Sequence, residues 1–150
     1  MPNNLKTDSE VVIYSALDGN PYVGVPQILP TILPVNLIER EPGVQPPRFI
    51  FRRVGDNVYT LTINGLQVIE LEGKLFAVVE GDPQEWVVTY RENHDAYTIV
   101  KRLDSPEEIG WIAPIDNNSR QIRVGPLIVG RSFPPFYPPQ ELYRFEFADE

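Results

Sequence analysis

The chain contains no cysteine and only one histidine. None of its 150 residues is cysteine, so disulfide bridges, thiolate catalysis and cysteine-ligated zinc sites are excluded. With His94 as the single histidine, a multi-histidine metal site is excluded and a Ser-His-Asp triad is disfavoured. The acidic residues are scattered along expected turns and give no converging carboxylate pair for hydrolysis. The sequence therefore predicts no catalytic residue, no metal and no other cofactor, and it predicts a solvated turn position for His94.

The chain is also poor in positive charge and in long apolar runs. It has 13 Lys and Arg against 21 Asp and Glu, a formal net charge of −8, which disfavours binding to nucleic acid. No apolar run approaches the ~18–20 residues that span a bilayer. Residues 1–10 lack the apolar region of a signal peptide. We expect a cytoplasmic monomer that binds neither nucleic acid nor membranes.

Helical periodicity is absent too, since no segment keeps an apolar period of 3.6 residues over several turns. Sixteen prolines and ten glycines divide the chain into short segments. Those segments are rich in β-branched and aromatic residues, and turn signals such as Asn64-Gly65 and Glu72-Gly73 separate them. This pattern predicts an all-β protein. The expected strands include residues 11–14, 49–51, 58–63, 75–79, 86–90, 96–100, 121–124 and 143–147.

The chain repeats itself in part. Residues 12–24 align without a gap on residues 98–110, with identical Leu, Asp and Gly at three positions. Two all-β hairpins can resemble each other by composition alone, but the repeat favours a single β-trefoil domain. We expect twelve strands with pseudo-threefold symmetry, forming a six-stranded barrel capped by three hairpins. The three units are expected at about 1–53, 54–103 and 104–150.

A proline-rich segment near the carboxyl terminus is the strongest candidate for a binding loop. Four prolines fall within residues 134–139, and proline restricts φ and so lowers the entropy lost on docking. The specificity pocket of a trypsin-like protease ends in a carboxylate, so the residue that fills it must be Arg or Lys, and Arg131 is followed by the small hydroxyl residue Ser132. This segment would add an extended strand to a protease cleft. The candidate P1 to P4′ residues are Arg131, Ser132, Phe133, Pro134 and Pro135.

A structural role for the same segment stays open. The aromatic residues Phe133, Phe136 and Tyr137 would then plug one end of the barrel, and Arg131 would pair with a surface carboxylate. The order of a basic residue, Ser, one variable residue and Pro-Pro nevertheless resembles the reactive loop of Bowman–Birk inhibitors. That loop is closed by a disulfide, and this chain has no cysteine to close one.

Other loops are secondary candidates. The apolar, proline-bracketed residues 25–34 would suit a chymotrypsin- or elastase-like pocket, or they would simply pack over the barrel. Asn64 would suit an asparaginyl endopeptidase, although Asn-Gly is first of all a hairpin turn. Lys74 lies at a turn where an exposed cation needs no special role. The secondary protease-binding candidates are Val25, Gln27, Leu29, Asn64 and Lys74.

Two further functions remain as alternatives. A carbohydrate-binding lectin would use Trp86, Trp111 or Tyr137 as stacking platforms. Gln84-Glu85-Trp86 matches the Gln-x-Trp signature of ricin-type lectins once. A cysteine protease inhibitor of the clitocypin type would use the first and third loops.

Several short stretches spread along the chain carry a resemblance to a known family: residues 23–24, 74–80, 84–88, 96–99, 110–111, 126–130 and 134–139. On these residues the chain, from about Val11 onward, resembles the small β-trefoil protease inhibitors of mushrooms. The similarity is greatest to the serine protease inhibitors of the cospin and cnispin type, and clitocypin and macrocypin are more distant. The resemblance implies a trefoil fold, no cofactor, cytosolic residence, a defensive or regulatory role and a protease as partner.

Members of that family place the reactive residue on different loops. The trypsin-inhibiting type has a basic residue on the loop after the second strand, where this chain has Val25. Other members have one between the last two strands, which matches Arg131. In the legumain-inhibiting relatives an Asn follows the fifth strand, and the Asn64 of this chain is displaced by three positions. The resemblance and the residues together predict a trypsin-like serine protease as the target, with Arg131 as the P1 residue.

Overall fold

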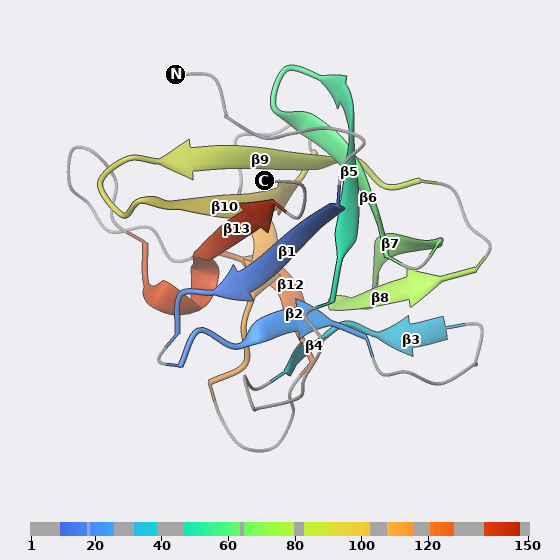
Figure 1. The fold of residues 1–150 in the computed structure, drawn as a ribbon, viewed down its shortest axis with the longest axis horizontal. Coiled ribbons are helices and arrows are strands. Elements are labelled where there is room, and N and C mark those ends of the chain that lie inside the picture. The colour runs from blue at the N-terminus through green and yellow to red at the C-terminus, as the bar shows by residue number, and fades with distance from the viewer. Residues whose placement is uncertain are drawn as a thin grey trace.

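The computed structural model describes residues 10–17, 19–25, 32–38, 47–63, 65–79, 83–102, 108–115, 121–127 and 137–147. These parts of the chain contain strands and one 3-10 turn (Figure 1). The elements are β1 (Glu10–Ser15), β2 (Tyr22–Gly24), β3 (Ile32–Pro34), β4 (Asn36–Ile38), β5 (Phe49–Gly55), β6 (Val58–Ile63), β7 (Leu66–Leu71), β8 (Lys74–Val78), β9 (Trp86–Arg91), β10 (Ala96–Lys101), β11 (Ile109–Ile112), β12 (Arg123–Pro126), η1 (Pro139–Glu141) and β13 (Tyr143–Phe147).

The strands form where apolar and polar residues alternate and turn residues allow reversal. In β6 every second side chain is buried, as expected for a strand with one face on the core. The reversal between β7 and β8 uses Glu72 and Gly73, whose φ angles are 52° and 79°. Two successive positive φ values are typical of a type I′ hairpin turn. The expected hairpin turn at these two residues is therefore confirmed.

The thirteen strands belong to one sheet that closes on itself. Antiparallel pairing runs from β8 through β7, β6, β5, β1, β13, β10, β11 and β12 and returns to β8, a closed circuit of nine strands. β9 joins β6 to β10, β2 and β4 extend from β1, and β3 pairs with β8. The protein is thus an all-β barrel with additional strands.

The predicted twelve-stranded β-trefoil is wrong. The described residues form thirteen strands instead of twelve, and the described strands are not divided four to each expected unit. Residues 1–53 hold β1 to β4 and most of β5, residues 54–103 hold β6 to β10, and residues 104–150 hold β11 to β13. The strands β7, β8, β11 and β12 are part of the closed circuit instead of forming a separate cap. β3 lies within the proline-bracketed residues 25–34, which the sequence predicts as a loop, and β4 is only three residues long.

Large aromatic side chains fill the interior. Trp111 packs edge-to-face against Trp86 and against Tyr143, with ring centroids 5.7 Å apart in each pair. All three side chains are buried, and the Trp86 indole donates to the Val68 carbonyl at 3.1 Å. Edge-to-face aromatic pairs stabilise a core beyond the area that they bury. The three rings thus belong to one continuous hydrophobic core.

Neither a membrane-spanning helix nor a metal-binding cluster occurs among the described residues. Their one helical element, η1, is three residues long. His, Asp and Glu side chains in these parts of the chain form no group of three that would hold a metal ion.

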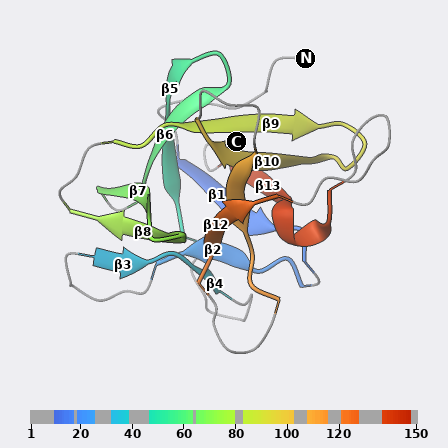
Figure 2. The ribbon, with the colours of Figure 1, turned by 180° about the vertical axis from the view of Figure 1, so that it is seen from behind.

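The 3-10 turn lies on the same side of the molecule as the free end of the β9–β10 hairpin (Figures 1 and 2).

Candidate functional site

The predicted reactive residues Arg131, Ser132, Phe133, Pro134 and Pro135 lie outside the described residues. We call residues 128–136 the proline-rich segment. The structure describes the residues that flank it, Leu127 and Tyr137. Both ends contact Glu108. The Leu127 amide donates to the Glu108 carbonyl at 2.9 Å, and the Tyr137 hydroxyl donates to the Glu108 carboxylate at 2.7 Å. We define this arrangement as the Glu108 clamp.

Strand register places Glu108 next to Leu127. Glu108 precedes β11 and Leu127 follows β12, and in the antiparallel ladder between these strands Ile109 lies opposite Pro126. One further step along the ladder brings Glu108 opposite Leu127, so their main-chain bond continues the sheet. The position of Glu108 is therefore set by the barrel.

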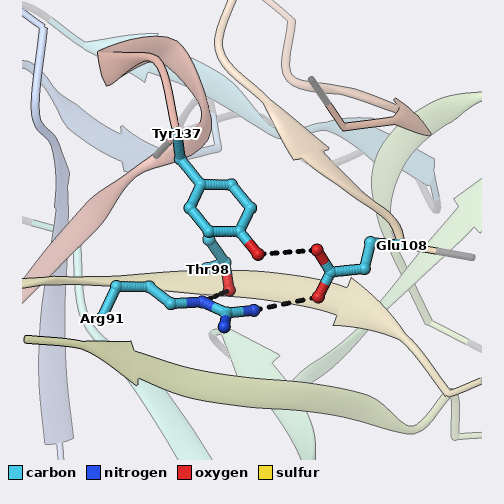
Figure 3. Close-up of polar contacts among 4 residues, drawn as sticks. All are labelled: Arg91, Thr98, Glu108 and Tyr137. Carbon is cyan, nitrogen blue, oxygen red and sulfur yellow. Dashed lines mark hydrogen bonds and ion pairs between the residues drawn. The ribbon is translucent and has the colours of Figure 1, made fainter. Parts of the chain in front are cut away.

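Arg91 holds the other oxygen of the Glu108 carboxylate. Its guanidinium donates to Glu108 at 2.9 Å and, through Nε, to the Thr98 hydroxyl at 3.1 Å (Figure 3). Arg91 is the last residue of β9 and Thr98 is a buried residue of β10. The guanidinium carbon also lies 4.6 Å from the centroid of the Tyr137 ring, within the range of a cation–π contact. One arginine thus orients both the acceptor and the donor of the tyrosine–glutamate bond.

Tyr137 is fixed through its main chain as well. Its amide donates to Nε2 of His94 at 3.0 Å, so Nε2 carries no proton in this arrangement. Arg144 donates to the carbonyls of His94 and Asp95 and so binds the turn that carries the imidazole. His94 lies in a turn, as expected, but it is half-buried and not simply solvated. Its imidazole accepts a hydrogen bond from the Tyr137 amide.

Apolar contacts add to these polar ones. Ala96, Tyr137 and Leu142 form a small buried cluster, separate from the main core, and Leu127 packs against it. Both ends of the segment therefore contribute side chains to the same cluster. The Tyr137 ring is 2% exposed, so the plugging role considered for Tyr137 is consistent with its position.

Burial changes the acid–base behaviour of Tyr137. Desolvation, as the main cause, and the bond to Glu108 together raise the pKa of Tyr137 to about 12, while Arg91 opposes the change. The hydroxyl consequently stays protonated at neutral pH and donates to the carboxylate. The pair forms a charge-assisted hydrogen bond, which is stronger than a bond between neutral groups.

The secondary candidates divide into buried, exposed and undescribed residues. Val25 is buried and belongs to the main core, so its side chain is not presented for binding. Lys74 is exposed at the start of β8, directly after the hairpin turn. Gln27, Leu29 and Asn64 lie outside the described residues.

The aromatic residues considered as sugar-stacking platforms are not accessible. Trp86 and Trp111 are 0% exposed and pack on each other, and Tyr137 is held in the Glu108 clamp. A stacking platform must present a ring face to the solvent. This observation counts against a lectin site built on these three residues.

Sequence reasoning missed Arg91, Thr98 and Glu108. They have no motif, and their proximity depends on the pairing of β9 with β10 and of β11 with β12. The strand that follows Glu108, β11, was not among the expected strands, and its pairing with β12 is seen only in the structure.

Comparison with known proteins relates the chain to peptidase inhibitors. A family model described as peptidase inhibitor I66 matches residues 32–147. The chain is also similar to the solved structure of a proteinase inhibitor from Coprinopsis cinerea, at 29% identity and a TM-score of 0.73. That similarity covers 95% of this chain and 98% of the other.

Two other solved structures share the fold at low identity. Cry35Ab1 gives a TM-score of 0.75 at 13% identity, over 97% of this chain and 37% of that one. A salivary protein from Culex quiquefasciatus, of the cysteine and tryptophan-rich family, gives a TM-score of 0.63 at 12% identity, over 95% and 98%. At these identities only the fold is shared. No curated protein matches the sequence.

Proposed function

Because this chain belongs to the peptidase inhibitor I66 family, we propose that it inhibits trypsin-like serine proteases by substrate-like binding. Arg131 is the proposed P1 residue, and Ser132 is P1′. The guanidinium would enter a specificity pocket that ends in a carboxylate, and the flanking residues would pair with the cleft as an added strand. The function is therefore inhibition of a protease partner and not catalysis.

One observation carries this proposal: a basic residue followed by Ser-Phe-Pro-Pro lies in a segment whose two ends are fixed to the same glutamate. A protease binds a peptide most tightly when little conformational entropy is lost on docking. Prolines at positions 134 and 135 restrict the leaving-group side of the proposed scissile bond. The proteinase inhibitor from Coprinopsis cinerea supports the same class of function.

The proposed interface is of the size usual for protease–inhibitor complexes, about 1,600 Å² in total. Such interfaces concentrate their binding energy in a few side chains. We therefore expect Arg131 to dominate the affinity, with the residues around it contributing mainly shape.

The test is Arg131→Glu, titrated against trypsin. The substitution places a negative charge against the pocket carboxylate, and we expect inhibition to weaken by at least about a thousandfold, since truncating one partner of a buried charge pair costs several kcal/mol. Arg123→Glu is the matched control, because Arg123 is exposed on β12 and its substitution changes the net charge equally. The control should inhibit trypsin as the wild type does.

A panel of proteases identifies the target class. The Arg131→Leu variant should no longer inhibit trypsin and should instead inhibit chymotrypsin, because the specificity pocket of chymotrypsin is apolar. Trypsin inhibition that survives in Arg131→Glu would contradict the proposal. If Lys74→Glu then abolished that inhibition, the reactive residue would be Lys74. Inhibition of papain or legumain without inhibition of trypsin would contradict the proposed protease class.

A further inference from the structure

We propose that Glu108 is a positioning residue that holds Leu127 and Tyr137, which flank residues 128–136 in the sequence, in fixed relation, so that a protease cleaves the peptide between them slowly. The inference rests on the proposed function insofar as it concerns inhibition. It assigns a role to a residue that does not itself lie in the segment.

Within the Glu108 clamp, we call the connection from Leu127 through Glu108 to Tyr137 the bridge. Its main-chain carbonyl accepts the amide of Leu127, and its carboxylate accepts the hydroxyl of Tyr137. The main-chain bond continues a sheet and is present whatever the side chain at position 108. The bond to Tyr137 depends on the Glu108 carboxylate, so the side chain at position 108 determines whether Tyr137 is joined to Leu127.

The barrel holds the bridge in place. Arg91 binds the carboxylate oxygen that Tyr137 leaves free, and Thr98 binds Arg91 (Figure 3). Arg91 lies on β9, which pairs with the barrel strands β6 and β10, and Thr98 lies on β10 itself. The side chains of Arg91 and Glu108 are 19% and 31% exposed, so water competes weakly for these bonds. The carboxylate therefore has a fixed position before any protease binds.

Fixed ends slow net cleavage of a substrate-like loop. When the hydroxyl of the protease serine attacks the Arg131 carbonyl carbon, an ester forms there and the peptide bond to Ser132 breaks. The nitrogen of Ser132 takes up the proton of that hydroxyl and leaves as an amine. If both ends of the segment stay bound to the barrel, that amine remains near the ester at high effective concentration. It then re-forms the peptide bond and releases the protease serine before water hydrolyses the ester. Loss of the bridge lets the amine move away.

The test uses two variants that remove the bridge and two matched controls. Glu108→Gln leaves one acceptor oxygen for two donors, and Tyr137→Phe removes only the hydroxyl while keeping the ring in its apolar cluster. Glu70→Gln and Tyr90→Phe are the controls, because Glu70 binds Lys101 and the Gly73 amide, and Tyr90 binds Asp95. Each control loses a contact of the same chemistry at another position.

The principal readout is the rate at which trypsin cleaves the Arg131–Ser132 bond, followed by mass spectrometry. The trypsin inhibition constant and the melting temperature are measured on the same proteins. We expect Glu108→Gln and Tyr137→Phe to be cleaved about tenfold faster than the wild type, consistent with loss of a hydrogen bond to a charged group. The controls should be cleaved at the wild-type rate, even where their melting temperatures fall by a similar amount.

The outcomes separate this inference from the proposed function. Equal cleavage rates in wild type, Glu108→Gln and Tyr137→Phe would overturn the positioning role even if Arg131→Glu abolishes inhibition. Conversely, a wild type that fails to inhibit trypsin would contradict the proposed function, while faster cleavage of the two variants would still support the bridge. Equally fast cleavage in the two controls would assign the effect to general stability and overturn the inference. If Glu108→Gln does not fold, Tyr137→Phe alone decides.

Discussion

The two ends of the β9–β10 ladder each carry a cation bound to a glutamate, but the second donors to these glutamates differ. At one end Arg91 binds Glu108, and at the other Lys101 binds Glu70, with nitrogen–oxygen distances of 2.9 Å in both pairs. The second donor to Glu70 is the amide of Gly73, three residues away, whereas the second donor to Glu108 is the hydroxyl of Tyr137. Glu70 therefore closes a local turn, and Glu108 joins distant parts of the chain.

Burial does not explain this difference. The side chains of Arg91 and Glu108 are 19% and 31% exposed, and those of Lys101 and Glu70 are 27% and 20% exposed. The two pairs are shielded from water to a similar extent. What distinguishes them is what the cation contacts besides the carboxylate, since Arg91 also binds Thr98 and lies over the Tyr137 ring. A planar guanidinium can serve several partners at once, and an ammonium cannot replace it in this role.

Removal of the cations should produce the largest difference between the two ends. We expect Arg91→Leu to lower the free energy of unfolding by about 3 kcal/mol, because it leaves a shielded carboxylate without its cation and removes the ring contact. For Lys101→Leu we expect a loss of about 1 kcal/mol, because the Gly73 amide still binds Glu70. Urea unfolding at neutral pH measures both values. Equal losses in the two variants would show that the additional contacts of Arg91 contribute nothing.

Much of the strand pattern was predictable from the sequence. Residues 58–63, 86–90 and 96–100 were expected as strands and are found in β6, β9 and β10, because their alternation and β-branched content are local properties. β3 and β4 were not predictable, because they are three residues long and depend on partners elsewhere, β8 for β3 and β2 for β4.

The internal repeat has a local physical cause at one aligned pair. A Cβ atom added at Gly110 would collide with the main chain of Ile99, and one added at Gly24 would collide with the ring of Pro47. Both positions therefore require glycine for close approach. This requirement accounts for the glycine identity at positions 24 and 110, but it carries no information on the other strands. A glycine shared by two segments does not predict threefold symmetry of the whole chain.

The candidate site was predictable only in part. Arg131 and the prolines around it form a pattern within a few residues, so the sequence alone identifies them. Glu108 and Arg91 are ordinary charged residues until strand pairing brings them together. The Glu108 clamp depends on the register of strand pairing, so no local sequence motif predicts it.

Alkaline pH should weaken the Glu108 end of the ladder through Tyr137. The pKa of Tyr137 is raised to about 12, first by burial and then by the bond to Glu108. Its stabilising effect is thus complete below the unfolded pKa of about 10 and is lost as the pH rises through the folded value. The difference in unfolding free energy between wild type and Tyr137→Phe should narrow by roughly 2 kcal/mol from pH 10 to pH 12.

Urea unfolding at a series of alkaline pH values checks this expectation. Tyr143, whose pKa is also raised by burial, is present in both proteins, so its contribution cancels in the difference. A difference between wild type and Tyr137→Phe that stays constant over this pH range would contradict the expected role of the hydroxyl.

Acidic pH should weaken the Glu70 end, with a smaller effect. The amide of Gly73 and then the side chain of Lys101 lower the pKa of Glu70 below 4.5. The ionised form is favoured in the folded protein, so the stabilisation is present above pH 4.5 and is lost as the pH falls through the folded pKa. At neutral pH we expect Glu70→Gln to be less stable than the wild type by about 1 kcal/mol, and below the folded pKa we expect this difference to disappear. Because the Gly73 amide is held within the hairpin, Lys101→Leu should retain part of this acid dependence, whereas Glu70→Gln should lose it. Identical acid profiles for the two variants would place the whole effect in the ion pair and none of it in the turn.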